Sequence, residues 1–456
     1  MFNNQEEMRM IRWKTWAVVV CSFLFVFVAN SRNAVDEPAN QQIDLSQPLT
    51  LQQCIQIAIK NSTDTRNARI DLVIQDLRVK NAKARYYPDI FLNGRYNFSN
   101  EIDFGFEREN YDLGVTGHYT LWDHGQREAS FSQAKQSRHA TASRNKQVSQ
   151  NLIFQVTQAY YSVLKAQELV NVDKEVMARS RDNTDRVRAF VQAGVQIEAD
   201  VATAQVREAN DELSLVTDQN DLDIAMANLP RLMGLNPAAV IIVAEDTGYQ
   251  LYRQKGEIEV METSLEETIQ RGFENRPEFK QIEARIKQLE WDLTLAKLER
   301  WPQLDAEYSY NVNLDDYLRE RENFEDFRSW DVTATLGFPI FDGGVRKRHV
   351  QEAELILEQT REDASDLERS VALEVRQAYL NLRRAERALA ISNTQVRNAD
   401  LSLQVIQGRF DQELSFLLEL LDAQTEFARA VTNQVRVFYD YKIVQTALQR
   451  AMGIIQ

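Results

Sequence analysis

An internal duplication constrains the fold of this chain more than any other feature of its sequence. Residues 51–61 (LQQCIQIAIKN) match residues 265–275 (LEETIQRGFEN) at an offset of 214. Further along, residues 158–160 (QAY) match residues 377–379 (QAY) at an offset of 219. Matches that keep their register over such a length indicate one large duplicated unit and exclude a solenoid of short repeats.

Each copy is predicted to contain a helix, two short strands and two long helices. The predicted organisation is an N-terminal linker at 32–48, a first repeat at 49–234, an equatorial segment between the repeats at 235–262 and a second repeat at 263–453. The predicted strands cover about 89–99 and 110–122 in the first repeat and about 303–313 and 330–341 in the second.

The long helices carry the period of a coiled coil. Counting alternately four and three residues forward from Leu152 gives a series of mostly apolar, often small residues that ends at Val191. The same count from Val371 gives a similar series that ends at Phe410. A repeat of 3.5 residues is typical of supercoiled helices. No Pro or Gly interrupts residues 126–192, which as one helix would extend for roughly 100 Å. An extended fibrous coiled coil would show the same pattern.

The four predicted strands are apolar on one face and polar on the other. In the clearest run, Tyr111, Leu113 and Val115 alternate with Asp112 and Gly114. Segments of about ten residues with this pattern fit a transmembrane barrel that has lipid outside and water inside. A soluble sheet packed on helices would alternate in the same way.

Aromatic residues stand at the strand ends that join the helices. Tyr87 and Trp301 precede the first strand of each copy, whereas Trp122 and Phe341 close the second. All four are expected at one height, as in the interfacial aromatic belt of a membrane barrel. They would equally suit a hydrophobic seal between the barrel and the helices.

The N-terminus resembles a secretory signal peptide. Three basic residues, the last of them Lys14, precede an uncharged apolar run at 15–29, which is short for a membrane span. We place the signal peptide at 1–31, with an uncleaved anchor as the alternative. The mature chain would then keep one cysteine, Cys54, and form no intramolecular disulfide. After residue 31 there is no apolar stretch of 18 residues, so membrane insertion would not use a helix.

Composition and motifs argue against several other functions. The formal net charge of −15 leaves no cationic excess with which to bind nucleic acid. The four histidines have no metal-ligand spacing to one another or to Cys54. The sequence contains no phosphate-binding loop, nucleophile elbow or H-E-x-x-H motif. We therefore predict no enzymatic activity, catalytic residue, cofactor or metal.

Four strands cannot close a barrel by themselves. An open sheet edge cannot face lipid, because its unpaired backbone groups find no water there. If the strands span a membrane, copies of the chain must assemble. Eight strands from a dimer would enclose a bore filled by side chains, whereas twelve from a trimer leave room for a lumen. A conduit therefore favours a homotrimer.

Taken together, these features resemble the TolC-type outer-membrane efflux proteins. The likeness rests on LTLQQCIQIAIKN at 49–61, the long helix pairs, FDGG at 341–344 and MGL at 233–235, and it covers essentially all of 49–453. It implies a mainly α fold with a β-barrel part: a homotrimer in which a twelve-stranded outer-membrane barrel joins a helical tunnel through the periplasm. Such a channel would serve a tripartite efflux or type I secretion system, with a periplasmic adaptor protein and an inner-membrane pump as partners.

The resemblance also assigns residues at the periplasmic end. It places the tip turns that contact the adaptor at Gly194 and Val195 in the first copy and at Glu413 and Leu414 in the second. Glu413 replaces the glycine usual in this turn.

An acidic constriction is implied just beyond the second turn, at Glu419 and Asp422, with Asp200 at the matching place in the first copy. Residues three apart share a helix face, although a solvated carboxylate pair near a helix start would look the same. The family's Tyr and Arg latch positions hold Phe410 and Ser415 here, which predicts a different latch or none.

Two other functions fit part of this pattern. One is a periplasmic coiled-coil scaffold or adaptor without membrane insertion, in which the alternating segments form a soluble sheet. The other is a single-chain outer-membrane barrel, against which the small number of strand signals and the helical C-terminus argue.

Overall fold

The computed structural model describes residues 47–101, 106–244, 247–255, 263–313, 328–412 and 414–455. The chain divides into two units, Met1–Gln47 and Pro48–Gln456. The expected signal peptide lies outside the described residues, as does the expected linker apart from residues 47 and 48.

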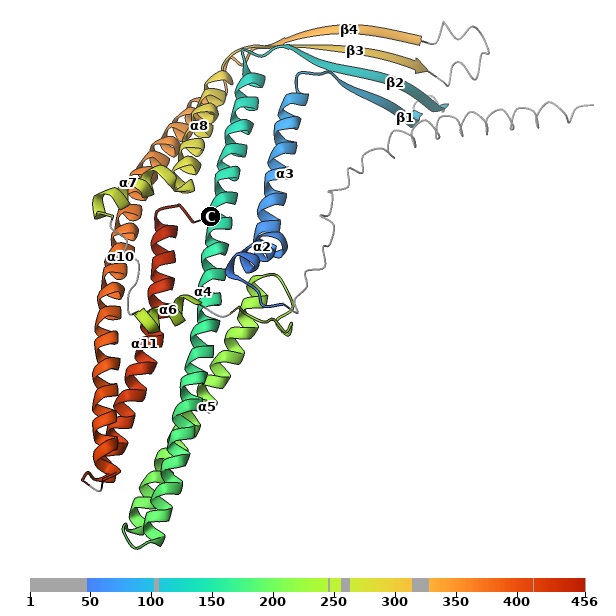
Figure 1. Cartoon of the computed structure of the whole chain (residues 1–456). Helices are drawn as coiled ribbons and strands as arrows, with labels where there is room; N and C mark the ends of the chain where they lie inside the picture. The colour runs from blue at the N-terminus through green and yellow to red at the C-terminus, as the bar shows by residue number, and fades with distance from the viewer. Residues whose placement is uncertain are drawn as a thin grey trace, which may run out of the picture. The chain divides into compact units, whose positions relative to one another are not determined.

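The second unit is mainly helical, as predicted, with one small sheet (Figure 1). The order helix, helix, strand, strand, helix, helix occurs on both sides of a short helix, α6. The elements before and including α6 are α2 (Leu51–Asn61), α3 (Thr63–Ala84), β1 (Asp89–Glu101), β2 (Phe106–Trp122), α4 (Gln126–Gln192), α5 (Glu198–Leu232) and α6 (Thr247–Lys255). Those after it are α7 (Leu265–Asn275), α8 (Pro277–Leu298), β3 (Gln303–Asn313), β4 (Arg328–Gly337), α10 (Val345–Phe410) and α11 (Leu417–Ala451).

The two longest helices follow the predicted coiled-coil period. The four-and-three series of α4 is buried from Leu152 to Val170, and that of α10 is buried or half-buried from Val371 to Phe410. With 67 residues, α4 extends for about 100 Å. The apolar stripe explains why helices of this length form, because each turn has a neighbouring helix to pack against.

Each long helix starts at a glycine capped by an earlier carboxylate. The N-cap residues are Gly125 and Gly344, with φ of 90° and 85°, angles that glycine adopts without strain. Asp342 stands two residues before the second of these glycines, and its carboxylate accepts hydrogen bonds from the backbone N–H of Gly344 at 2.9 Å and of Arg346 at 3.1 Å. Asp123 does the same before α4.

The helices lie side by side in one layer whose order changes along its length. Near the sheet, α3 contacts α4, α4 contacts α8, and α8 contacts α10 (Figure 1). Toward the other end α5 contacts α4, α4 contacts α11, and α11 contacts α10. Among these described helices, α3 and α5 therefore form one side of the layer and α10 forms the other.

The sheet is antiparallel with the order β1-β2-β3-β4. Its strands begin close to the predicted positions, but β4 ends at Gly337, whereas the predicted strand extends to about 341. Pro339 has no backbone N–H with which to continue a ladder. No helix in the described residues is long and apolar enough to cross a membrane.

We predict that Gly453→Ala destabilises the protein by about 2 kcal/mol. Gly453 follows α11 with a φ of +71°, and an added Cβ would lie 2.8 Å from the backbone nitrogen of Arg276. Gly408→Ala is the matched control, since Gly408 lies within α10 with no atom near its Cβ position, and it should stabilise by roughly 0.5–1 kcal/mol. Thermal unfolding followed by circular dichroism measures the stability of both variants. If Gly453→Ala is no less stable than Gly408→Ala, this packing is wrong.

Candidate functional site

Two turns stand at the end of the helical layer away from the sheet. Both close with a hydrogen bond to the carbonyl five residues back, from Val195 to Phe190 at 2.9 Å and from Leu414 to Arg409 at 2.8 Å. The first turn passes through Gly194, whose φ is +75°, as a helix C-terminus closed by a left-handed residue requires. Glu413, the predicted counterpart in the second turn, lies outside the described residues.

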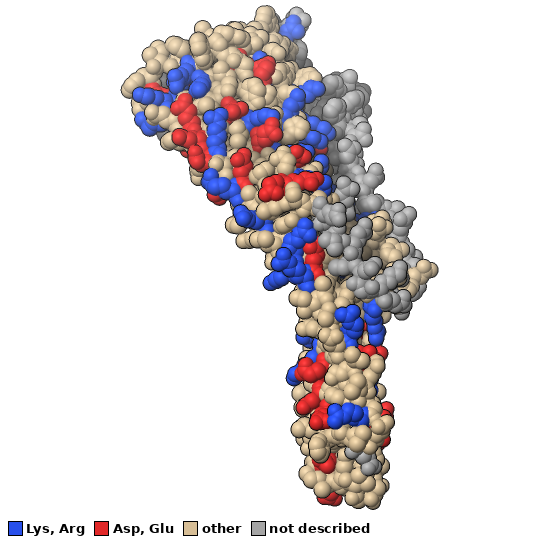
Figure 2. All heavy atoms as spheres, turned by 60° about the vertical axis from the view of Figure 1, so that its left-hand side comes forward, with Lys and Arg blue, Asp and Glu red and all other residues tan. Residues whose placement is uncertain are grey.

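The turns present apolar side chains to solvent. The most exposed are Val195, Ile197, Leu414, Phe416 and Leu418. In the face shown in Figure 2 the corresponding end is mostly uncharged, whereas acidic and basic side chains alternate over the helices above it. A large apolar group such as Phe416, 79% exposed, is typical of a contact surface.

The two predicted constriction carboxylates lie on the first turns of α11. Glu419 and Asp422 are both exposed, and their spacing puts them on one face of the helix. The hydroxyl of Ser415 donates a hydrogen bond to Glu419. Asp200 is placed differently, because its carboxylate accepts a bond from the backbone N–H of Ile197 at 3.4 Å. Asp200 therefore has a capping contact at the start of α5 that Glu419 and Asp422 lack.

An apolar cluster and two polar contacts hold the α4–α5 pair against the α10–α11 pair near the turns. The buried residues of the cluster are Val187, Ala204, Phe410, Leu417, Leu420 and Leu421. Phe410, at the family's tyrosine position, packs its ring 6.3 Å from that of Phe190.

The polar contacts are an ion pair of 3.2 Å between Arg186 and Asp411 and a hydrogen bond of 2.6 Å between Asn183 and Gln424. The sequence did not suggest these pairs, because their members are more than 200 residues apart.

The four predicted interfacial aromatics lie where the strands join the helices. Tyr87, Trp122, Trp301 and Phe341 are all exposed, Phe341 by 89%. The rings of Trp122 and Trp301 both contact the imidazole of His124, with centroids 3.6 and 4.8 Å away. Part of this set therefore packs together, while Tyr87 and Phe341 extend into the surroundings.

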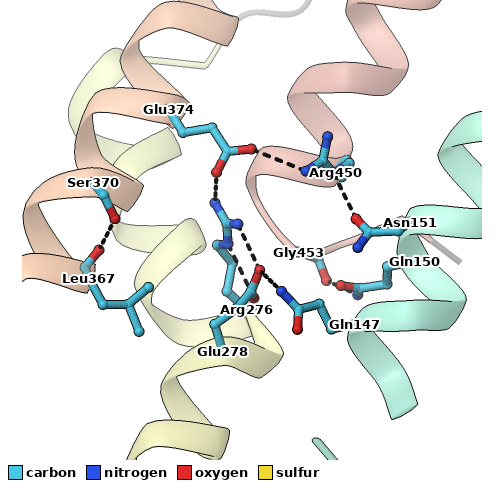
Figure 3. Close-up of polar contacts among 10 residues, drawn as sticks. All are labelled: Gln147, Gln150, Asn151, Arg276, Glu278, Leu367, Ser370, Glu374, Arg450 and Gly453. Atoms are coloured by element: carbon cyan, nitrogen blue, oxygen red, sulfur yellow. Dashed lines mark hydrogen bonds and ion pairs between the residues drawn. The ribbon is translucent and has the colours of Figure 1, made fainter. Parts of the chain in front are cut away.

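A buried polar network joins four helices at the level of the α7–α8 corner (Figure 3). At its centre Arg276, 7% exposed, contacts Glu278 on α8 at 2.8 Å and Glu374 on α10. Arg450 on α11 lies 3.6 Å from Glu374 and donates to Asn151 on α4 at 3.1 Å. The sequence analysis did not predict this network. Pro277 is the first residue of α8 and is typical of a helix start, but it indicates no partner for the arginine.

The network sets the charge state of Glu278. Burial by itself would raise the pKa of this carboxyl, but hydrogen bonds from Arg276 and from Gln147, at 3.0 Å, hold its pKa below the ordinary glutamate value. The carboxylate therefore stays ionised, and the network fixes α4, α8, α10 and α11 against one another.

The chain was compared with known proteins. The family model described as outer membrane efflux protein matches residues 54–235 and 268–454. The chain belongs to this family. Protein CyaE of Bordetella pertussis is 24% identical over 433 residues, covering 94% of this chain and 89% of that protein. Outer membrane protein TolC of Vibrio cholerae is 23% identical over 382 residues, covering 82% and 84%.

Solved structures show the same fold. The open state of the Neisseria gonorrhoeae MtrE outer membrane channel superposes with a TM-score of 0.76 at 19% identity, covering 89% of each chain. The family confirms the predicted resemblance, the outer-membrane location and the role as a channel of an efflux or secretion system. In the described residues no group of three His, Cys, Asp or Glu is placed to hold a metal ion.

We predict that Arg276→Met lowers the free energy of unfolding by about 3 kcal/mol, because it leaves Glu278 buried without its cation. Arg369→Met is the control, since Arg369 pairs with Asp366 at an exposed site, and it should change stability by less than about 0.5 kcal/mol. Denaturant unfolding of both variants measures the difference.

The pH profile of this variant gives a second readout. In the native protein the stability that Glu278 contributes is complete above about pH 4.3 and is lost as pH falls through its lower folded pKa. Without Arg276, burial raises the pKa of Glu278, so its contribution should reverse and destabilise as pH rises above about 4.3. Parallel profiles for native and variant protein would contradict the role of Arg276.

Proposed function

We propose that three copies of this chain form one channel, with twelve strands closed into an outer-membrane barrel and the helices closed into a tunnel through the periplasm. The observation that carries this proposal is that both sides of the described unit end in an edge that packs against no further strand or helix of the unit. The two edges are formed by different elements. The sheet has one free edge at β1 and the other at β4. The helical layer has one free edge at α3 and α5 and the other at α10.

The sheet supports membrane insertion. Apart from Phe91, its exposed apolar residues share one face and come from all four strands, as Leu92 opposite Val115 and Tyr308 opposite Val332 illustrate. The opposite face carries polar ladders such as Thr120 to Asp305 at 2.8 Å. Lipid on the apolar face, water on the polar face and the aromatics at the helix junction together fit a barrel wall.

The helical edges support assembly from identical copies. Exposed apolar residues follow helical spacing along both edges: Ile70, Val73, Ile74 and Leu77 on α3, Val206, Leu213 and Val216 on α5, and Leu355, Leu373, Leu380 and Leu401 on α10. The α3–α5 edge of one copy packed on α10 of the next would bury both stripes. Such a head-to-tail contact closes into a ring when the rotation fits.

The tip provides the gate and the partner surface of this channel. Three copies would bring Glu419 and Asp422 to the mouth as six carboxylates, where the concentrated negative charge attracts cations. Asp200 would add to this ring. The apolar turns at Gly194, Val195 and Leu414, with Glu413, would contact a periplasmic adaptor.

Opening the mouth would separate the α4–α5 pair from the α10–α11 pair. This movement would break the contacts of Arg186 with Asp411 and of Asn183 with Gln424. Conduction is passive, without catalysis or a cofactor, and an inner-membrane pump supplies the energy.

The double variant Glu419→Ala/Asp422→Ala should raise single-channel conductance and lower cation selectivity in planar bilayers, because it removes the charges at the narrowest point. The matched control is Glu358→Ala/Asp363→Ala, which removes two exposed carboxylates in the first third of α10, far from the tip, and should leave the current unchanged. Equal currents in native and double-variant channels would contradict the constriction, and the absence of any channel in the native protein would contradict the proposed function.

A further inference from the structure

Between the Arg276 network and the tip turns, the coiled-coil positions of α4 change from apolar to polar. These positions, spaced alternately by four and three residues, are apolar and buried from Leu152 to Val170 and are apolar and buried again at Val187. Three of the four positions between are polar: Asp173, Ser180 and Thr184, with Met177 the exception. A polar residue at a core position of a coiled coil lowers the stability of the helix packing, and the size of this effect depends on the groups that the residue contacts.

A cavity lies beside this polar stretch. It is open to solvent on one side and has a volume of about 710 Å³ between α4, α5 and α11. The charged groups that line it include Asp173 from α4, Asp211 and Asp218 from α5, and Arg429 and Arg436 from α11. The wall is thus less tightly packed here than in the apolar cluster around Leu420 near the turns.

Two carboxyl groups meet at the edge of this cavity. Asp173 on α4 and Asp218 on α5 both line this cavity, and their carboxyl groups interact across the α4–α5 interface. The Oδ2 atom of Asp173 is buried and accepts no hydrogen bond from a donor among the described residues. A hydrogen bond between two carboxyl groups requires that one of them hold a proton.

The charged neighbours are arranged so that this proton is held close to neutral pH. Burial together with the carboxylates of Asp218 and Asp211 raises the pKa of Asp173 to about 6, and Arg436 on α11 opposes the rise only in part.

The remaining cations at this level have other partners. Arg207 faces Asp211, Arg429 pairs with Glu426 at 2.8 Å, and Arg179 pairs with Glu175 at 3.7 Å.

We propose that Asp173 and Asp218 form a proton-binding pair that fastens α5 to α4 when protonated and releases it when both groups are ionised. The consequence for gating rests on the proposed function, whereas the pair itself does not. With the helices fixed above by the Arg276 network, release at this level would let the tip segment move. The loosened α4–α5 pair would then separate more readily from the α10–α11 pair, so the channel would open more readily at neutral than at acidic pH.

The packing of α5 on α4 depends on pH in a direction set by the raised pKa of Asp173. Because the folded pKa of Asp173 lies above that of a free aspartate, about 3.9, protonation favours the packed state. The packing is complete at low pH and weakens as pH rises through about 6.

Distance measurements between α4 and α5 test this pair. Spin labels on Lys174→Cys and Gln219→Cys, both exposed, in a Cys54→Ala background report the separation of the helices in the purified mature chain. From about pH 5 to about pH 7 the distribution should broaden with a midpoint near 6. Asp173→Asn, which is neutral and can still donate to Asp218, should keep a narrow distribution throughout.

The controls separate this pair from other titrating groups. Asp182→Asn, an exposed aspartate on the same helix, should behave as the native protein. Infrared titration should show one carboxyl group that loses its proton near pH 6. This signal should be missing in Asp173→Asn and also in Asp218→Asn. Two variants are used so that the result does not depend on the folding of either one.

A pH-independent native distribution, or an unchanged transition in Asp173→Asn, would overturn the proposal. Both readouts use protein in detergent and need no ion conduction. A failure of the channel in bilayers would therefore be recognised separately.

Discussion

The need to satisfy backbone hydrogen bonds at the edges of a small sheet governs everything else in this structure. β1 and β4 each pair on one side within the described residues, and the apolar face that they share is exposed. In lipid an unpaired edge has no water to bond, so a sheet of this kind is stable there only when further strands complete it. The helical layer ends in exposed apolar stripes along the same two sides, so one head-to-tail contact between copies would close both parts.

Below the sheet the helical wall combines a fixed frame with a weaker end. Arg276 and its partners join four helices through charge-assisted bonds, in which Arg276 is buried and Glu374 is 39% exposed. Nearer the tip the two helix pairs are joined by the apolar cluster around Leu420 and by contacts such as the exposed ion pair of Arg186 with Asp411, and an exposed ion pair contributes little. The stretch around Asp173 lies between these regions. A channel that must stay in place in its membrane while its mouth opens needs this gradient of stability.

Much of the fold could be predicted from periodicity, whereas most side-chain partners could not. The two-residue alternation predicted the strands and the 3.5-residue period predicted the long helices, because each reports which faces are buried along one segment. Pro339 shortened β4 by removing a backbone donor, and the glycines after Asp123 and Asp342 took the cap positions because they accept positive φ. Contacts such as Asn183 with Gln424 join distant segments and leave no local pattern in the sequence.

The candidate site divides in the same way. The positions of Glu419 and Asp422 on one helix face followed from their spacing, while the capping contact of Asp200 depended on the turn before α5. The central claim is closure by three copies, and the most direct measurement is the native mass of the complex extracted from isolated outer membranes. A complex of three mature chains is the predicted result. A single chain recovered with the soluble periplasmic proteins would contradict the account.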